Sequence, residues 1–302
     1  MRPPKPTPGV QMLLATLVPG VLAAAFFLHA ALPDTVELEW RFVAGEPFFE
    51  ETETSTRARG SEQLSKRTYV FRWLPISENE FGDWTIERRL ERIKVESENA
   101  GANIVVYDSA NPDGNSAVFE RVYDGLVGWQ SAVVLSPKYE VANLILPRAP
   151  QPNSPAADVA DFHNHETHRE MIESLLVWTR PRRVRGGDSW AVDRFPQALV
   201  ATGFEAHTFR HDGRDGALDR LRADIAVRQF VSKNGAPVAV RGNGAVLQQH
   251  KGIATFDRDR GRFSRLELYL DVKGNFMMLA GGGAEGVYQT RRITRITDAL
   301  PE

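Results

Sequence analysis

Residues 252–272 read GIATFDRDRGRFSRLELYLDV and predict a β-hairpin. Apolar residues recur at every second position of its second half: Leu266, Leu268, Leu270 and Val272. That period is typical of a strand with one buried face. The charged stretch between the two halves ends near Gly261, and glycine readily adopts the positive φ angle that a tight hairpin end requires. We therefore expect a fold built from long antiparallel hairpins.

Other stretches indicate further strands. Three of them alternate in the same way: VELEWRF at 36–42, TYVFRWL at 68–74 and ALDRLRADIAVRQF at 217–230. In WTIERRLERIKVESE at 84–98 the apolar positions change frame after Leu90, which predicts a β-bulge that bends the sheet. The stretch EETETSTRARG at 50–60 is polar on both faces, and we interpret it as an exposed strand whose charges would protect a sheet edge.

Aromatic residues recur on single faces of these strands, so we expect them to line one interior. They are Trp40, Tyr69, Phe71, Trp73 and Trp84. A solidly packed interior would make them a core and nothing more, which is what such aromatics usually form. A cavity of at least about 300 Å³ walled by these side chains would instead indicate a site for an apolar ligand.

Two helices are predicted. Apolar residues at helical spacing between Val118 and Leu126 indicate a short helix, with Asn115 or Ser116 as its N-cap. Four prolines between Pro147 and Pro155 predict an irregular linker. A second helix is expected to follow this linker, over residues 157–178.

The chain is therefore predicted to be mainly β with a minor helical part. We expect curved antiparallel sheets or half-barrels in two lobes, joined by a helical connector and preceded by an N-terminal hydrophobic helix. The expected divisions are 1–33 as signal peptide or membrane anchor, 34–146 as a first β-rich lobe with one helix, 147–182 as proline-rich linker and connector helix, and 183–302 as a second β-rich lobe.

The N-terminal sequence predicts the subcellular localisation of the protein. Arg2 and Lys5 precede the mostly apolar segment VQMLLATLVPGVLAAAFFLHAAL at 10–32, and a basic flank before such a segment is typical of an export signal. The segment is also about long enough to span a bilayer, which takes roughly 20 residues. We expect a cell-envelope protein, exported to the periplasm or exterior or anchored in the inner membrane by residues 10–32. Cleavage of the segment could follow Ala25 or lie near Ala30-Ala31.

Composition excludes several classes of site. The chain of 302 residues has no cysteine, which rules out disulfides, thiolate metal sites and a cysteine nucleophile. Its formal net charge of −2 gives no overall attraction to nucleic acid, and no nucleic-acid partner is expected.

Several of these stretches, taken together, resemble the sequence pattern of a protein family. They are VELEWRFVAGEPFFEETETS at 36–55, DWTIERRLERIKVESE at 83–98 followed by VVYDS at 105–109, VRGGDSW at 184–190, and the hairpin at 252–272. In these features the chain resembles a family of uncharacterised bacterial cell-envelope proteins, a domain-of-unknown-function family, over roughly 36–297. The resemblance implies a secreted or anchored β-rich fold, and because the family has no established activity it implies no catalytic residues.

The candidate metal ligands lie in DFHNHETHRE at 161–170, which contains His163, His165 and His168. On a helix His165 and His168 share a face while His163 points elsewhere, and on a strand His163 and His165 share a face without His168. Zinc needs three or four converging ligands, so a catalytic site would require a distant third ligand such as His207 or His211. We interpret the segment as a solvated helix and assign no metal, cofactor or catalytic residue.

Two further motifs are given structural interpretations. The arginines of RPRRVRGGDSW at 180–190 could hold an anionic group, but we expect them to pair with glutamates of neighbouring strands. Within this stretch the Gly-Gly-Asp-Ser segment is expected to turn into a strand, with local side-chain bonds from Asp188 and Ser189. AGGGAEG at 280–286 has no following helix and is interpreted as a hairpin end.

The leading hypothesis for function is a non-enzymatic envelope protein that binds an apolar or amphiphilic ligand, a lipid, or a protein partner of the envelope. One alternative is a metal-dependent hydrolase that uses His163, His165 and His168. The other is a structural β module that assembles through its strand edges.

Overall fold

The computed structural model describes residues 35–58, 64–99, 102–147, 164–179, 183–194, 201–232, 239–277 and 283–301. The N-terminal hydrophobic segment at 10–32 and the proline-rich linker therefore lie outside the described residues. Within them the chain is mainly β, as the sequence predicts, and every strand pairing is antiparallel. No helix in these ranges is both long and apolar enough to cross a bilayer.

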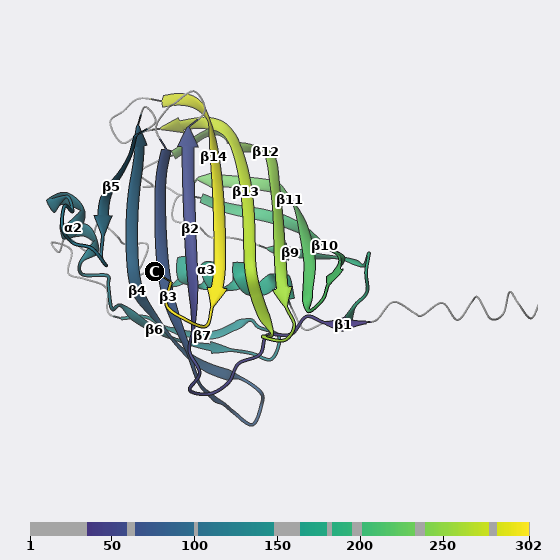
Figure 1. Cartoon of the computed structure of the whole chain (residues 1–302). Helices are drawn as coiled ribbons and strands as arrows, with labels where there is room; N and C mark the ends of the chain where they lie inside the picture. The colour runs from purple at the N-terminus through teal and green to yellow at the C-terminus, as the bar shows by residue number, and fades with distance from the viewer. Residues whose placement is uncertain are drawn as a thin grey trace, which may run out of the picture.

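One sheet of 12 strands dominates the molecule (Figure 1). Its strands are β2 (Phe48–Ala58), β3 (Leu64–Glu78), β4 (Trp84–Asn99), β5 (Ala102–Asp108), β6 (Gln130–Leu135), β7 (Val141–Ile145), β9 (Ser189–Arg194), β10 (Ala201–Asp215), β11 (Leu218–Ser232), β12 (Ala239–Asp257), β13 (Arg262–Met277) and β14 (Gly283–Thr297). Their order across the sheet is β7-β6-β4-β3-β2-β14-β13-β12-β11-β10-β9, and β5 pairs with β4 off this path.

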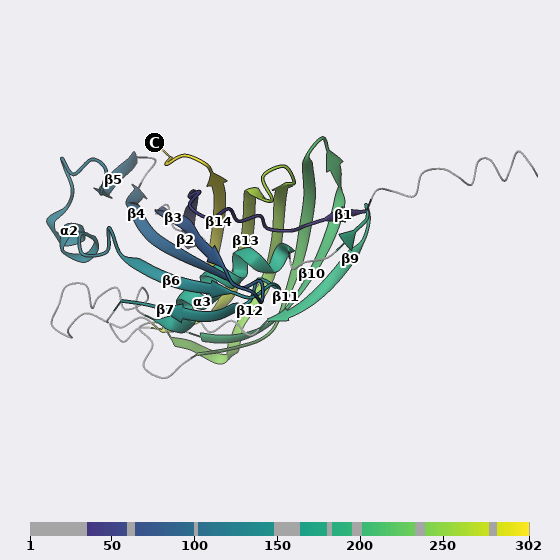
Figure 2. The same ribbon diagram turned by 90° about the horizontal axis from the view of Figure 1, so that it is seen from below.

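The sheet curls into an open half-barrel (Figure 2). Among the described residues β7 pairs only with β6 and β9 only with β10, so the two ends do not join. The pairing of β2 with β14 places strands from both halves of the chain in the same sheet. The division into two lobes stays a prediction.

A helical segment lies inside the curve of the sheet (Figure 2). It consists of α3 (His165–Leu176) and a 3-10 turn, η2 (Val177–Thr179). The predicted helix over 157–178 is thus confirmed from His165 onward, and its first part falls outside the described residues. The other predicted helix is α2 (Ala117–Tyr123), which follows β5.

The N-terminal stretch 36–42 packs into the same interior. Only β1 (Val36–Glu37) is a strand, and it pairs with β8 (Arg183–Val184) rather than with the large sheet. The predicted alternation still holds, because Val36, Leu38, Trp40 and Phe42 are all buried. The stretch is held against the hairpin of β12 and β13, where the backbone nitrogen of Arg41 donates to the carbonyl oxygen of Gly261 at 2.8 Å.

Local predictions for the strands are confirmed. Gly261 has a φ angle of 60° at the end of the β12–β13 hairpin. The register of β3 and β4 shifts between Val70 and Phe71, which pair with Arg92 and Leu90 and leave Glu91 as the extra residue of a bulge. This is the position at which the apolar frame of β4 changes.

The interpretation of residues 50–60 as an edge strand is wrong. Residues 50–58 form most of β2, which lies in the middle of the sheet between β3 and β14, and residues 59 and 60 lie outside the described residues. Charges on its outer face are paired across strands: Glu51 with Arg295 at 2.6 Å and Glu53 with Lys66 at 3.2 Å. Cross-strand pairing of this kind lets a strand that is polar on both faces occupy a central position.

Candidate functional site

The concave face of the sheet carries regular cross-strand rows around β2. In one row Thr52 pairs with Tyr69 of β3 and with Thr294 of β14. In the next row Thr54 pairs with Arg67 and Arg292 on the same two strands. Side chains in a row point to the same face and lie about 4.5–5.5 Å apart at Cβ. The register therefore places hydroxyl, phenol and guanidinium groups side by side.

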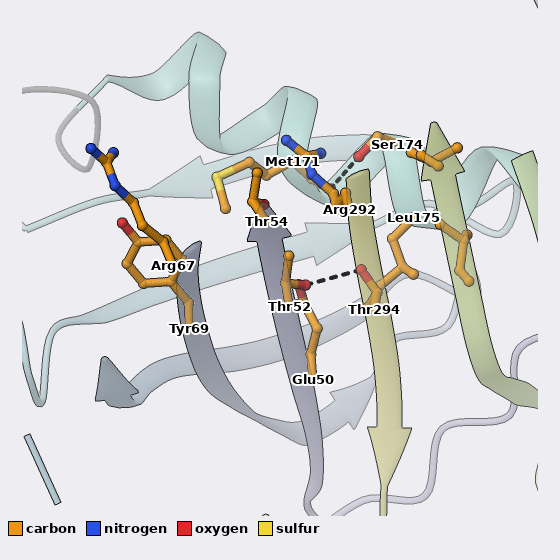
Figure 3. Close-up of a pocket in the computed structure, with 12 residues that line it drawn as sticks. Glu50, Thr52, Thr54, Arg67, Tyr69, Met171, Ser174, Leu175, Arg292 and Thr294 are labelled. Atoms are coloured by element: carbon orange, nitrogen blue, oxygen red, sulfur yellow. Dashed lines mark hydrogen bonds between the residues drawn. The ribbon is translucent and has the colours of Figure 1, made fainter. Parts of the chain in front are cut away.

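These rows and α3 enclose a cavity of about 220 Å³ (Figure 3). Its lining comes from β2, β3, β13, β14 and α3: Glu50, Thr52, Thr54, Arg67, Tyr69, Met171, Ser174, Leu175, Leu266, Leu268, Arg292 and Thr294. One part of the wall is apolar, made by α3 and β13, and the other part is polar, made by β2, β3 and β14. A cavity with two such walls matches an amphiphilic ligand.

The deepest polar group of the cavity is already satisfied by the protein. The Glu50 carboxylate accepts hydrogen bonds from the Trp73 indole at 2.8 Å, from Arg88 at 3.0 Å and from the Thr52 hydroxyl at 3.0 Å. Thr52 and Thr294 also share a hydrogen bond of 3.0 Å. The polar side chains of the floor thus bond to one another, which leaves the apolar wall and the upper row to contact a ligand.

Burial also affects ionisation beside this cavity. Desolvation lowers the pKa of the Arg88 guanidinium, while the nearby Glu50 carboxylate acts to raise it. Desolvation raises the pKa of the Tyr69 hydroxyl far above its ordinary value of 10.0, so Tyr69 is a neutral hydrogen-bonding group at physiological pH.

The aromatic residues predicted to line one interior form its packed core, which is the outcome expected of such residues. Phe42 packs against Trp40 and Trp84, with ring centroids 5.9 and 5.7 Å apart, and Phe48 stacks on Trp73 at 5.6 Å. Trp40, Phe71 and Trp73 are each 4% exposed or less, so their rings contact one another and their neighbours rather than an open cavity. The smaller cavity lies beside the aromatic core, and of the five predicted residues only Tyr69 lines it.

The interpretation of the histidine segment as a solvated helix is wrong for one residue. His165 is exposed, but His168 is only 1% exposed, and its ring stacks on Trp129 with centroids 4.6 Å apart. His163 lies outside the described residues. Helical spacing separates His165 from the apolar positions of α3 and places His168 on the same side as Ile172 and Leu175. On that side Trp129 provides a flat apolar surface for the His168 ring.

The two distant histidines lie elsewhere. His207 and His211 are both buried on β10, and the His211 Nε2 atom lies 2.8 Å from the Asp219 carboxylate. Asp219 is fully buried and also pairs with Arg258 at 3.0 Å. Among the described side chains, no three histidines or carboxylates come close enough together to hold a metal ion.

The arginine-rich stretch behaves partly as expected. Arg183 pairs with Glu37 at 2.6 Å through the β1–β8 contact, and the pair is exposed. Gly187 has a φ angle of 86°, and the Asp188 carboxylate accepts from the backbone nitrogen of Arg185 at 2.8 Å, so the stretch turns into β9 as predicted. Arg180 and Arg182 lie outside the described residues, as do residues 280–282 of the glycine-rich hairpin end.

Sequence reasoning missed the cavity because its polar residues gave no alternating signal. Glu50, Thr52 and Thr54 face inward, while Glu51 and Glu53 face outward with equal polarity. One signal was present: Phe48 is in the same two-residue frame as the inward group and is a typical core residue. Extending its frame along β2 would have marked these three residues as facing the interior.

Comparisons with known proteins bear on the fold alone. No protein-family model and no curated protein matches the chain. Among solved structures the chain is similar to one described as "Lipid-protein interactions in lipovitellin", with a TM-score of 0.50 and 6% identity over 87% of this chain and 26% of that chain. DynF from the dynemicin biosynthesis pathway of Micromonospora chersina matches over 90% of this chain and 88% of that chain at 10% identity, but its TM-score of 0.24 is too low to support an argument. The chain therefore shares a fold with about a quarter of the lipovitellin chain.

Proposed function

We propose that this protein binds an apolar or amphiphilic ligand, such as a lipid, in the cavity between α3 and the concave face of the sheet. The observation that best supports this proposal is the set of residues that line the cavity. An apolar wall lies opposite the hydroxyl groups of β2 and β14, and it is formed by Met171, Leu175, Leu266 and Leu268. The fold shared with lipovitellin supports the proposal, since that structure is described as one of lipid–protein interactions. This support is by analogy of fold.

The volume of the cavity limits the ligand. About 220 Å³ is less than the roughly 300–1,000 Å³ of typical small-molecule sites. We therefore expect a small amphiphile, or one segment of a longer lipid whose remainder lies outside the cavity.

Filling the cavity tests this proposal. Ser174 lines the cavity and its neighbour Glu173 does not, so Ser174→Trp should abolish binding while Glu173→Trp on the same helix should not. Native purification of the full chain, organic extraction and mass spectrometry would compare the lipid that copurifies with the wild type and with each variant. Equal lipid recovery from both tryptophan variants, with both folded by circular dichroism, would place any bound lipid elsewhere and refute the proposal.

We further propose that the protein works in the cell envelope, exported or anchored through residues 10–32. Fractionation of cells that express a C-terminally tagged chain should recover it in the periplasm, the medium or the inner membrane. Recovery of the intact chain from the cytoplasm would contradict this part of the proposal.

Of the two alternatives, only the strand-edge module has an observation in its favour. The terminal strands β7 and β9 each pair on one side only within the described residues, so each offers backbone groups to another strand. Sedimentation velocity over a range of concentrations would detect such assembly. For the metal-dependent hydrolase, the stacking of His168 against Trp129 turns one of the three candidate ligands away from His165 and into the core.

A further inference from the structure

We propose that the ligand of this cavity is an anionic amphiphile whose head group binds at Arg67, Thr54 and Arg292. The inference rests on the proposed function and adds the charge and the orientation of the ligand. The head group is a carboxylate or a phosphate at the upper row of the cavity, and the chain of the ligand runs along the apolar wall toward Leu266.

The register of the sheet brings the three head-group residues together. Thr54 on β2 pairs directly with Arg67 on β3 and directly with Arg292 on β14. The two arginines therefore flank one threonine on the same face of three adjacent strands, and all three residues line the cavity. In Figure 3 the Arg67 side chain extends on the side of Tyr69, away from Thr54 and Arg292. Adjacent strands are about 4.8 Å apart, so a change of rotamer at Arg67 would bring its flexible side chain to an anion that Thr54 and Arg292 contact.

The charges of the lining favour an anion. Arg67 and Arg292 are its two cations, and Glu50 is its one carboxylate. Glu50 lies two rows below, beyond Thr52, and is already paired with the buried Arg88. Among the residues that line the cavity, the upper row therefore carries two cations and no carboxylate.

Exposure gives the ligand its orientation. Arg67 is exposed and Arg292 is partly exposed, while Thr52, Thr294 and Glu50 below them are buried. An ionised head group costs least to bind where it keeps part of its contact with water. The guanidinium groups bind carboxylate or phosphate through paired hydrogen bonds, and the Thr54 hydroxyl adds one more donor.

The apolar wall suits the chain of the ligand. Leu268 pairs with Arg292 and Leu266 pairs with Thr294 across β13 and β14, so the apolar wall begins beside the head-group site and continues inward. Met171 and Leu175 of α3 cover the same space from the other side. Because Thr52 and Thr294 bond to each other, they offer an alkyl chain little unsatisfied polarity.

Four ligands that share a ten-carbon chain but differ in the charge of the head group test whether the site prefers an anion. Decanoate, decyl phosphate, decanol and decyltrimethylammonium would be titrated into the delipidated full chain by calorimetry, below the concentrations at which they form micelles. We expect one or both anions to bind about tenfold or more tightly than decanol, because hydrogen bonds to an ionised head group are stronger than those to a neutral hydroxyl. The tighter of decanoate and decyl phosphate identifies the head group.

Substitutions locate the head-group site. Arg67→Gln and Arg292→Gln should each weaken binding of the preferred anion about tenfold and leave decanol unchanged. Arg291→Gln is the matched control, because Arg291 is adjacent in sequence but lies on the opposite face, where it pairs with Glu267 at 3.0 Å. Raising the salt concentration should weaken the binding of the anion and leave the binding of decanol unchanged.

The outcomes separate this inference from the proposed function. Tight binding of decanol with no preference for an anion, or arginine variants that bind the anion as the wild type does, would overturn the anionic head group and keep the lipid site. Failure of all four ligands to bind, together with no lipid in the native preparation, would overturn the proposed function itself.

Discussion

A guanidinium nitrogen of Arg88 lies 3.0 Å from a carboxylate oxygen of Glu50, and both side chains are buried beneath the cavity. The Arg88 guanidinium also lies 3.4 Å from the ring centroid of Phe71, so the cation is covered by an aromatic face. A buried pair of this kind depends on both partners, because the removal of one leaves an uncompensated charge away from water.

The buried pair should therefore respond very differently to single and double substitution. We expect Glu50→Leu to reduce the free energy of unfolding by about 3–5 kcal/mol, and Glu50→Leu with Arg88→Met to cost less than this single change. Glu51→Leu on the outer face, which breaks the pair with Arg295, should cost about 1 kcal/mol or less. Urea denaturation of these variants and of Arg88→Met measures the coupling, and strictly additive losses would contradict the interpretation.

The two described histidines of α3 should differ in their effect on stability. His168→Ala removes a buried ring stacked on Trp129 and should cost about 1–3 kcal/mol, whereas His165→Ala on the exposed side should change stability by about 0.5 kcal/mol or less. Thermal unfolding followed by circular dichroism compares the two variants. Equal melting temperatures would mean that His168 contributes nothing through this contact.

Gly252 should resist even the smallest substitution. A Cβ atom at this position would lie 2.5 Å from the Cη2 atom of Trp178, a residue that is itself 1% exposed. We expect Gly252→Ala to destabilise the protein by about 1–3 kcal/mol, because the indole must shift within a packed core.

The matched control for this change is Gly186→Ala, where a Cβ atom would meet nothing within 4 Å. Near-ultraviolet circular dichroism reports tryptophan packing and should change only for Gly252→Ala. An unchanged spectrum and melting temperature for that variant would show that η2 can move away from β12 without cost.

Acid sensitivity should depend in part on Glu267 on the convex face. Burial alone would raise the pKa of this carboxyl group, but hydrogen bonds from Tyr269, Arg291 and Arg265 lower it from 4.5 to about 2. A carboxyl group with a lowered folded-state pKa stabilises the fold above its unfolded-state pKa, and that contribution is lost as the pH falls from about 4.5 toward 2.

Glu267→Gln should accordingly be less stable than the wild type at pH 7, by about 1 kcal/mol because the cluster is solvent-screened. The difference should shrink as the pH is lowered toward 2. Urea midpoints measured at pH 7, 4.5 and 3 provide the comparison. A difference that stays constant over this range would show that the ionisation of Glu267 is not linked to folding.

Structural features that depend on residues close together in the sequence were predicted correctly. The β12–β13 hairpin follows from the alternation of its apolar residues and from Gly261, and the bulge at Glu91 follows from the change of frame in β4. The helix over Ala117–Tyr123 follows from apolar residues at helical spacing. In each case the pattern and the structure that it predicts lie within about twenty residues of each other.

The position of β2 could not be predicted in this way. Its polar residues alternate with other polar residues, so beyond Phe48 at the start of the strand neither face is marked as buried. Thr52 reaches the interior because its neighbour on β14 is Thr294, which lies 242 positions away in the chain. A charged strand becomes central only when distant strands supply partners for both of its faces, and no local pattern specifies those partners.

Local residue patterns were enough to specify long antiparallel strands with one apolar face, because a two-residue period is a local property of the backbone. They also specified where the helix that carries His165 and His168 falls. The contact of His168 with Trp129, the packing of the aromatic residues and the cavity beside them under α3 were instead set by the three-dimensional fold. The physical reason is that burial depends on which surfaces meet across the curved sheet, and those surfaces are brought together by pairings between residues far apart in the chain.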